Sequence, residues 1–308
     1  MKAAVIVPNW KLPPSGGRKG LHLISKTLMD NGVDCVTVGW KYEHAPIGDT
    51  VIPPPMFHPD EETVFILPEG VNGLRMAGYF LDMLDLPHGP VVQYIQSTGL
   101  TDPHQEWATN YWGLGPLQRE IAGDKMKIPA DMPIEELRQP VDTEWWKRVD
   151  EGYSEDESER IPGSILYSTS RNVTVLDSVA RKCGTKPAFR VAGATQEELR
   201  TLMTIADIFV LASTSEGQSS ILNEAMSMEL ACVTWPSGGL PDIITHEQNG
   251  MMVAQNDTVG LADCVRNLQK DPERARELGK NAREWCVENL SVKGFESRLM
   301  ELWSKLPE

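Results

Sequence analysis

The first half of the chain alternates short apolar runs with segments of helical periodicity. A β-branched run, "KAAVIVP", is followed by a Gly-rich loop, a helical pattern from Leu21 to Asn31 that ends at Gly32, and a second apolar run, "DCVTVG". Further strands are predicted at "TVFIL" and "VVQYI", with a helix over residues 74–85 between them. Short apolar strands separated by helices are typical of a parallel sheet covered on both faces. This half therefore predicts a doubly wound α/β domain.

The same alternation returns in the second half. Strands are predicted at "SILYSTS", "AFRVAG", "DIFVLA", "ACVTW" and "GMMVA". The helices between them are predicted over about 173–183, from near Gln196, from about Ser220 and after Pro241. A closing helix has a clear start, because Asp271 can cap it and Pro272 can take its first position. The second half thus predicts another Rossmann-like domain.

Residues 124–163 differ from both halves, since they carry four prolines and the acidic run "SEDESER" with little periodicity. Such a stretch is typical of an interdomain connection. We therefore expect a first domain over 1–145, a linker over 146–163 and a second domain over 164–308. The last helix of the second domain can pack back on the first.

The amino-acid composition is that of an ordinary globular protein. The chain has 308 residues, of which 41% are hydrophobic and 24% charged, as in ordinary globular proteins. No apolar stretch approaches the roughly 18 residues that would suggest a membrane span. The start, "MKAAVIVPNW", is too short in its apolar part for a signal peptide. We expect a cytoplasmic protein without a transmembrane segment.

The distribution of charge disfavours some partners, and the spacing of the cysteines disfavours a zinc or redox site. The net charge of −15 is spread over both halves, which disfavours nucleic acid and anionic membranes as partners without excluding a local basic patch. The five cysteines lack the paired spacing of a zinc site or redox motif. They are predicted to be buried free thiols: Cys35, Cys183, Cys232, Cys264 and Cys286.

One candidate ligand site is the stretch "STSEGQSSILNEA", residues 213–225, directly after the run "DIFVLA". In a doubly wound sheet, ligands collect beyond the carboxyl ends of the strands. The backbone N–H groups of Ser219, Ser220 and Ile221 are expected at the start of the next helix, where the dipole favours an anion such as a diphosphate. Gly217 lets the backbone approach a ligand closely.

Two acids flank this turn, with Glu216 expected in the loop and Glu224 about one turn into the helix. Carboxylates accept pairs of hydrogen bonds from vicinal hydroxyls, so the two could hold two sugars. The alternative is that Glu216 is solvated and Glu224 interacts with the helix dipole. The pair alone does not decide between them.

Residues 194–286 closely resemble the donor-binding half of glycosyltransferase family 4, the retaining GT-B enzymes. The matching features occur in order: the "EEL...ADIFVLAS" lead-in, the glutamate pair, the Gly238-Gly239 turn before "LPDII", the "NG" hairpin and the "DPERARELGKNARE" helix. The resemblance implies two Rossmann-like lobes facing a cleft, a nucleotide sugar on the second lobe, and no metal ion.

Residue roles follow from the resemblance by position. Glu216 is similar to the carboxylate that faces the donor sugar, and Glu224 to the one that binds the ribose hydroxyls. Gly238 and Gly239 are expected to let a second helix start face the donor, or to form an ordinary tight turn.

The first half resembles the family more loosely. "PPSGGRKGLHLISKTLMDNGVDCVTVG" looks like the opening loop and first helix of the acceptor domain, and "PVDTEWWKR" like the stretch leading into the hinge. Gly16 and Gly17 resemble the loop that approaches the diphosphate, where Arg18 or Lys19 could add positive charge. Solvation of these exposed cations is the alternative.

The chain departs from the family pattern at the cations and on the acceptor side. Family members usually carry an arginine closely followed by a lysine after the first donor-lobe strand, whereas Arg171 has no lysine in the next ten residues. Arg171 or Arg190 is expected to neutralise the diphosphate, unless helix N-termini hold it. The usual acceptor-lobe histidine is absent from "VVQYIQSTGL", with His104 downstream. The aromatic cluster "EWATNYW" could stack on an acceptor or belong to the core.

These features predict a retaining glycosyltransferase that moves a sugar from a nucleotide sugar, such as a UDP- or GDP-sugar, to a saccharide or small-molecule hydroxyl, without a cofactor or metal. Two alternatives stay open: a phage-type DNA base glycosyltransferase, and a GT-B protein that binds sugar nucleotides without turnover. A nicotinamide dehydrogenase is disfavoured, because no Gly-x-Gly-x-x-Gly follows either leading strand.

Overall fold

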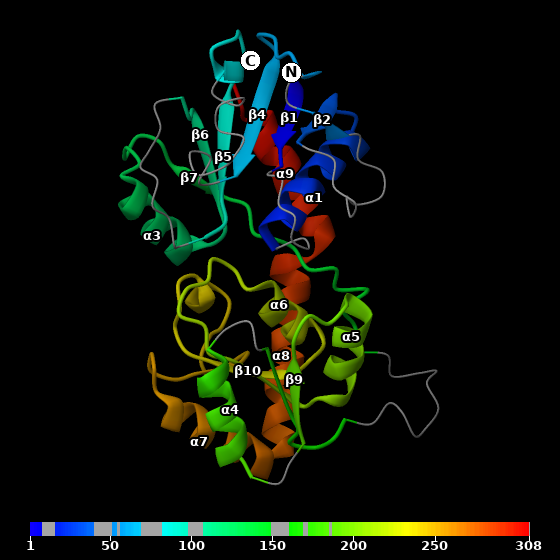
Figure 1. Ribbon diagram of the computed structural model, residues 1–308, viewed down its shortest axis with the longest axis vertical. Helices are drawn as coiled ribbons and strands as arrows, with labels where there is room; N and C mark the ends of the chain where they lie inside the picture. Colours follow the sequence, from blue (N-terminus) through cyan, green and yellow to red (C-terminus); the bar gives the residue numbers. More distant parts are fainter. Residues whose placement is uncertain are drawn as a thin grey trace. The chain divides into compact units, whose positions relative to one another are not determined.

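The protein divides into two compact α/β units (Figure 1). The computed structural model describes residues 1–7, 16–39, 51–53, 56–68, 82–97, 107–148, 160–168, 172–184 and 187–307. Unit 1 comprises Met1–Gln139 and Phe295–Glu308, and unit 2 comprises Pro140–Gly294. The chain therefore leaves unit 1 once and returns to it at its end.

Unit 1 is built on a seven-stranded parallel sheet in the order β3-β2-β1-β4-β5-β6-β7. Its strands are β1 (Lys2–Ile6), β2 (Cys35–Val38), β3 (Val51–Ile52), β4 (Thr63–Pro68), β5 (Val91–Ile95), β6 (Asn110–Gly113) and β7 (Ile134–Glu136). The central strands β4 and β5 are buried along their whole length, which explains why their sequences are continuous apolar runs.

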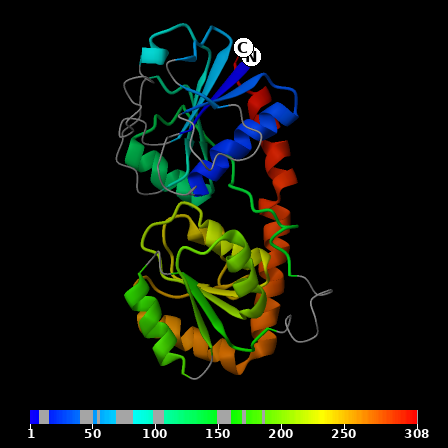
Figure 2. The ribbon, with the colours of Figure 1, turned by 45° about the vertical axis from the view of Figure 1, so that its right-hand side comes forward.

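Three helices of unit 1 have described bounds: α1 (Gly16–Asp30), α3 (Pro116–Met126) and α9 (Val292–Ser304). Residues 82–84 are also helical, and the rest of the helix predicted over 74–85 lies outside the described residues. Leu21 and Leu28 of α1 share a core with Phe295 and Leu299 of α9, so the blue and red helices lie against the same sheet (Figure 2). The end of the chain thus contributes to the core of unit 1.

Unit 2 contains a five-stranded parallel sheet in the order β12-β11-β10-β8-β9. Its elements in chain order are β8 (Ile165–Ser168), α4 (Val173–Lys182), β9 (Ala188–Val191), α5 (Gln196–Ile205), β10 (Ile208–Leu211), α6 (Ser220–Ser227), β11 (Ala231–Thr234), the 3₁₀ turn η3 (Leu240–Asp242), β12 (Met251–Met252), α7 (Thr258–Lys270) and α8 (Pro272–Leu290). One core lies under α5, α6 and α8, and another under α4 and α7. Both faces of the sheet are therefore covered.

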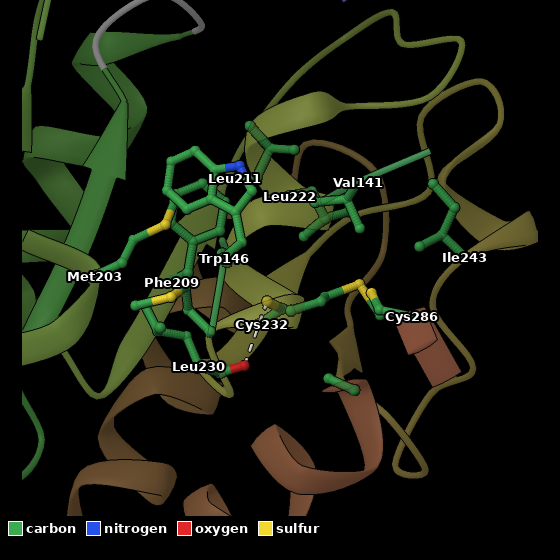
Figure 3. Packing of buried hydrophobic residues seen from close by; sticks show 14 of the residues in the cluster. Val141, Trp146, Met203, Phe209, Leu211, Leu222, Leu230, Cys232, Ile243 and Cys286 are labelled. Atoms are coloured by element: carbon green, nitrogen blue, oxygen red, sulfur yellow. Dashed lines mark hydrogen bonds between the residues drawn. The ribbon is translucent and has the colours of Figure 1, made fainter. Parts of the chain in front are cut away.

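The segment that enters unit 2 is part of its core. Trp146 is 4% exposed and packs with Met203, Phe209 and Leu211 (Figure 3). Val141 donates a backbone hydrogen bond of 2.9 Å to Leu290, at the end of α8. The division after residue 139 therefore differs from the predicted boundary at 145, because the apolar residues of this segment are buried in unit 2.

Three further expectations from the sequence can be compared with the structure. The region from residue 124 onward, read as part of a connection, contains the end of α3 and strand β7. Tyr111 and Trp112 of β6 are each 1% exposed and belong to the core of unit 1, so the core role is confirmed for these two aromatics over the stacking role. The thiol prediction is confirmed for four cysteines, which are free and buried, whereas Cys264 is half-buried.

Candidate functional site

The candidate site begins where β10 ends. All four residues of this strand are buried, and it lies between β8 and β11. Its apolar run stops at Ala212, and the polar residues 213–219 form a loop that leads into α6. Because all the strands are parallel, the loops after β8, β10 and β11 emerge at the same edge of the sheet. The stretch singled out in the sequence is therefore located at the edge where doubly wound sheets commonly bind ligands.

Three hydrogen bonds hold this loop to its neighbours. The side-chain amide of Asn172, after β8, donates to the backbone carbonyl of Ala212 at 2.7 Å. The indole N–H of Trp235, at the end of β11, donates to the carbonyl of Ser213. The backbone N–H of Gly239 donates to the carbonyl of Glu216 at 3.0 Å. The loops after three neighbouring strands thus form one connected structure.

Helix α6 begins at Ser220, where the sequence predicted a start. Its N-cap residue, Ser219, makes no capping hydrogen bond with its side chain. The first amides of the helix therefore do not donate to the cap side chain, and a helix N-terminus is a place where proteins commonly bind anions. Six consecutive residues of α6, Leu222–Ser227, are buried, so the body of the helix is anchored in the core.

The two predicted carboxylates come from this loop and this helix. Glu216 is half-buried in the loop, and Glu224 is 9% exposed on α6. A carboxylate as buried as that of Glu224 needs hydrogen-bond or charged partners, because burial otherwise disfavours the ionised form. A loop carboxylate and a helix carboxylate on one β-loop-α unit can each accept hydrogen bonds from the hydroxyls of a bound sugar.

The Gly238-Gly239 turn lies beside Glu216, because of the hydrogen bond from the Gly239 amide. Gly238 has φ of +56°, a conformation that side chains rarely adopt, so glycine is required there. The expected second helix start is only the three-residue 3₁₀ turn η3. The turn therefore shapes the loop and offers no helix dipole of useful length, which corrects that expectation.

The other predicted residues are not brought to this loop by the described contacts. Gly16, Gly17 and Arg18 form the first turn of α1 in unit 1, so the glycines belong to the helix and not to the preceding loop; the side chain of Arg18 is outside the described part. Arg171 also lies outside the described residues. Arg190 is exposed on β9, two strands away from β10 in the sheet order.

Arg190 pairs in register with Tyr167 of β8. The phenol of Tyr167 donates a hydrogen bond of 2.9 Å to Asp177 on α4. Burial, followed by this hydrogen bond to Asp177, raises the pKa of Tyr167, whereas the positive charge of Arg190 lowers it. Arg190 therefore contributes positive charge on the α4 face of the sheet.

Sequence reasoning missed Asn172 and Trp235, whose side chains hold this loop in place. Asn172 directly follows Arg171, but nothing in the sequence indicates that its side chain reaches β10. Trp235 ends the apolar run "ACVTW" and has the signature of a core residue. The one available signal is that a buried indole N–H needs a polar partner, which a polar loop can supply. On the acceptor side, Gln93 and Tyr94 are buried in β5, and His104 lies outside the described residues.

The described residues lack two features, a metal-binding cluster and a membrane-spanning helix. No group of three or more His, Cys, Asp or Glu side chains there could hold a metal ion. Within the same part of the chain, no helix combines the length and apolar character needed to cross a membrane.

Comparison with known proteins identifies relatives of unit 2. Residues 170–285 match the family model described as "Glycosyl transferases group 1". The N-acetyl-alpha-D-glucosaminyl L-malate synthase of Bacillus anthracis is 35% identical over 93 residues, which cover 30% of this chain and 24% of that protein. The alpha-maltose-1-phosphate synthase of Mycolicibacterium smegmatis is 32% identical over 115 residues, or 35% of this chain and 30% of that protein. The chain thus spans less than a third of these relatives.

Solved structures resemble the whole chain. The sucrose-phosphate synthase of Thermosynechococcus elongatus has a TM-score of 0.77 at 14% identity and covers 99% of this chain and 98% of its own. HepE from Anabaena, in complex with UDP and glucose, has a TM-score of 0.75 at 12% identity and covers 99% and 100%. These similarities confirm the predicted GT-B fold with two parallel-sheet domains.

Proposed function

Residues 170–285 carry the sequence of a glycosyl transferases group 1 domain, and on this premise we propose that the chain is a retaining glycosyltransferase. It moves a sugar from a nucleotide sugar to a hydroxyl of a saccharide or small molecule. The observation that carries the proposal is the loop after β10. It bears Glu216, is hydrogen-bonded to the loops on either side, and leads into a helix that bears the buried Glu224.

Each part of this loop-helix unit has a role in the proposal. Glu216 accepts hydrogen bonds from the transferred sugar, and Glu224 accepts them from the ribose. The amides at Ser219, Ser220 and Ile221 hold the diphosphate, because the start of α6 has no side-chain cap. Gly217 allows the loop backbone to approach the donor. The nucleotide sugar is a substrate, and the scheme needs no cofactor.

The proposed reaction is front-face substitution with retention at the anomeric carbon. The bond from that carbon to the diphosphate oxygen breaks, and the acceptor hydroxyl attacks from the same face and gives up its proton. Negative charge builds on the departing diphosphate, and helix amides with Arg171 or Arg190 stabilise it. The scheme includes no protein nucleophile and no metal ion.

Donor binding is tested first by thermal unfolding against UDP, GDP, ADP and their sugars. UDP and UDP-glucose head the panel, since HepE has been solved with both. In Glu224→Ala, binding of the preferred nucleotide should weaken by about 1.5–3 kcal/mol, as expected for a lost hydrogen bond to a charged group. Glu288→Ala, an exposed change on α8, is the control and should keep the full thermal shift.

Transfer is tested with a labelled form of the donor that binds, offered to a panel of sugar and small-molecule acceptors. Glu216→Gln should lower kcat by about tenfold or more, because the lost carboxylate contacts the reacting sugar. The variant should still bind the nucleoside diphosphate. NMR of the product should show the anomeric configuration of the donor. Donor binding with neither transfer nor hydrolysis would instead indicate a sugar-nucleotide-binding protein, and an inverted product would exclude the retaining mechanism.

A further inference from the structure

We propose that the hydroxyl of Ser237 binds the transferred sugar of the donor and helps to select it. This inference rests on the proposed function and adds a sugar-binding residue that lies outside the glutamate-bearing loop. It follows from three observations on Ser237: its position, its burial, and the state of its hydrogen-bonding groups.

Ser237 lies between two attachments to the Glu216 loop. Trp235, two residues before it, donates to the carbonyl of Ser213, and Gly239, two residues after it, donates to the carbonyl of Glu216 at 3.0 Å. The left-handed conformation of Gly238 turns the chain sharply between these attachments. Ser237 is therefore held against the loop that carries the proposed sugar-binding carboxylate.

The side chain of Ser237 is buried without being used by the fold. The residue is 3% exposed, and its Oγ makes no hydrogen bond with the part of the chain that the structure describes. Its backbone carbonyl does have a partner, since it accepts a hydrogen bond of 3.1 Å from Leu240. A buried hydroxyl that makes no hydrogen bond lowers the stability of the folded state, so alanine at this position should make the folded protein more stable. Because this hydroxyl lies beside the Glu216 loop, a ligand bound there can supply the missing hydrogen-bond partner.

The chemistry of a hydroxyl complements that of the neighbouring carboxylate. Glu216 can only accept hydrogen bonds when ionised, whereas Ser237 can donate one as well. A sugar hydroxyl or ring oxygen can accept from Ser237 while another hydroxyl of the same sugar donates to Glu216. The diphosphate has a separate place in the proposed site, at the start of α6. The geometry therefore assigns Ser237 to the sugar.

The test compares Ser237→Ala with the wild-type protein by calorimetry, using the nucleoside diphosphate and the nucleotide sugar that give the largest thermal shifts. The variant should bind the nucleotide sugar about fivefold to tenfold more weakly, the loss of one hydrogen bond, and the nucleoside diphosphate equally well. Its melting temperature without ligand should be unchanged or higher, because an unsatisfied hydroxyl is gone.

Thr27→Val is the matched control. Thr27 is 1% exposed on α1, and its Oγ1 also lacks a partner. This substitution should likewise leave the melting temperature unchanged or raised, but both ligands should bind as before. An equal loss for both ligands in Ser237→Ala would move the contact to the diphosphate and overturn the assignment to the sugar. A lower melting temperature with unchanged affinities would show that the hydroxyl is structural. If the wild-type protein binds no nucleotide sugar, the proposed function fails, and the role of Ser237 fails with it.

Discussion

The side-chain amide of Asn172 donates a hydrogen bond of 2.7 Å to the backbone carbonyl of Ala212, which joins the loop after β8 to the end of β10. Asn172 adopts a left-handed conformation, with φ of 43° and ψ of 47°, and its side chain does not cap α4. An asparagine tolerates this conformation better than most residues. Its amide is thus committed to the loop that carries Glu216.

Replacing Asn172 by glycine should impair transfer more than folding. Glycine adopts the left-handed conformation easily, so relief of backbone strain offsets part of the lost hydrogen bond. We expect kcat/KM to fall by about fivefold to tenfold, equivalent to roughly 1 kcal/mol, through looser positioning of Glu216. The control is Asn256→Gly, an exposed asparagine with φ of 65°, which should leave kcat/KM unchanged. Equal effects of the two substitutions on kcat/KM would rule out a specific role for the Asn172 amide.

Arg283 should stabilise the segment around Thr143 and Trp146, through which the chain enters unit 2. Its guanidinium donates to the carbonyl of Ser227 at 2.7 Å and to those of Thr143 and Trp146, each at 3.2 Å. Arg283→Ala should lower the free energy of unfolding of unit 2 by about 2–3 kcal/mol, because carbonyls lose a charged donor in a largely buried site. Urea denaturation followed by tryptophan fluorescence measures the loss. Arg276→Ala, exposed on the same helix, should change it little, because alanine is at least as good a helix former as arginine, and a similar loss in both would show that the hydrogen bonds of Arg283 are not the cause.

Two glycines should respond to alanine in opposite directions. A Cβ at Gly279 on α8 would lie 2.1 Å from the backbone oxygen of Glu229, whose φ is 61°. Gly279→Ala should therefore destabilise the protein by about 2–4 kcal/mol, since backbone must move. At Gly123 on α3 the nearest atom is 3.5 Å away, an ordinary contact, so alanine should stabilise by about 0.5–1 kcal/mol. Thermal unfolding of the two variants checks both signs, and a stable Gly279→Ala protein would contradict the observed packing.

The elements that the sequence predicts well are those with strong local signals. Asp271 accepts a hydrogen bond of 3.0 Å from the Arg274 amide and so caps α8 as expected, with Pro272 in the first position. Strand β10 is a buried apolar run bounded by polar residues, which places the loop of Glu216 at the carboxyl edge of the sheet without coordinates. The position of the candidate site was therefore predictable from pattern and topology together.

The contacts that complete the site are not predictable in this way. The bonds from Asn172 and Trp235 join side chains to backbone carbonyls of distant segments, and no periodicity encodes such pairs. The sequence does not predict strand β6, because Tyr111 and Trp112 are aromatic neighbours, which suit a stacking surface as well as a core. Burial, which only the fold decides, distinguishes the two.

Acid should weaken the attachment of Lys305 and Arg298 to Glu301 on α9. Hydrogen bonds from Lys305 and then from Arg298 lower the pKa of Glu301 from 4.5 to about 2. Because the folded pKa lies below the unfolded one, this stabilisation is fully present above about pH 4.5 and is lost as the pH falls towards 2. Glu301→Gln should therefore melt at a lower temperature than wild type at neutral pH, and the difference should vanish near pH 2. Thermal unfolding at low salt across this range measures the difference, with Glu296→Gln on the same helix controlling for the loss of one acidic residue. A constant difference from neutral pH to pH 2 would mean that the glutamine acts through something other than these ion pairs.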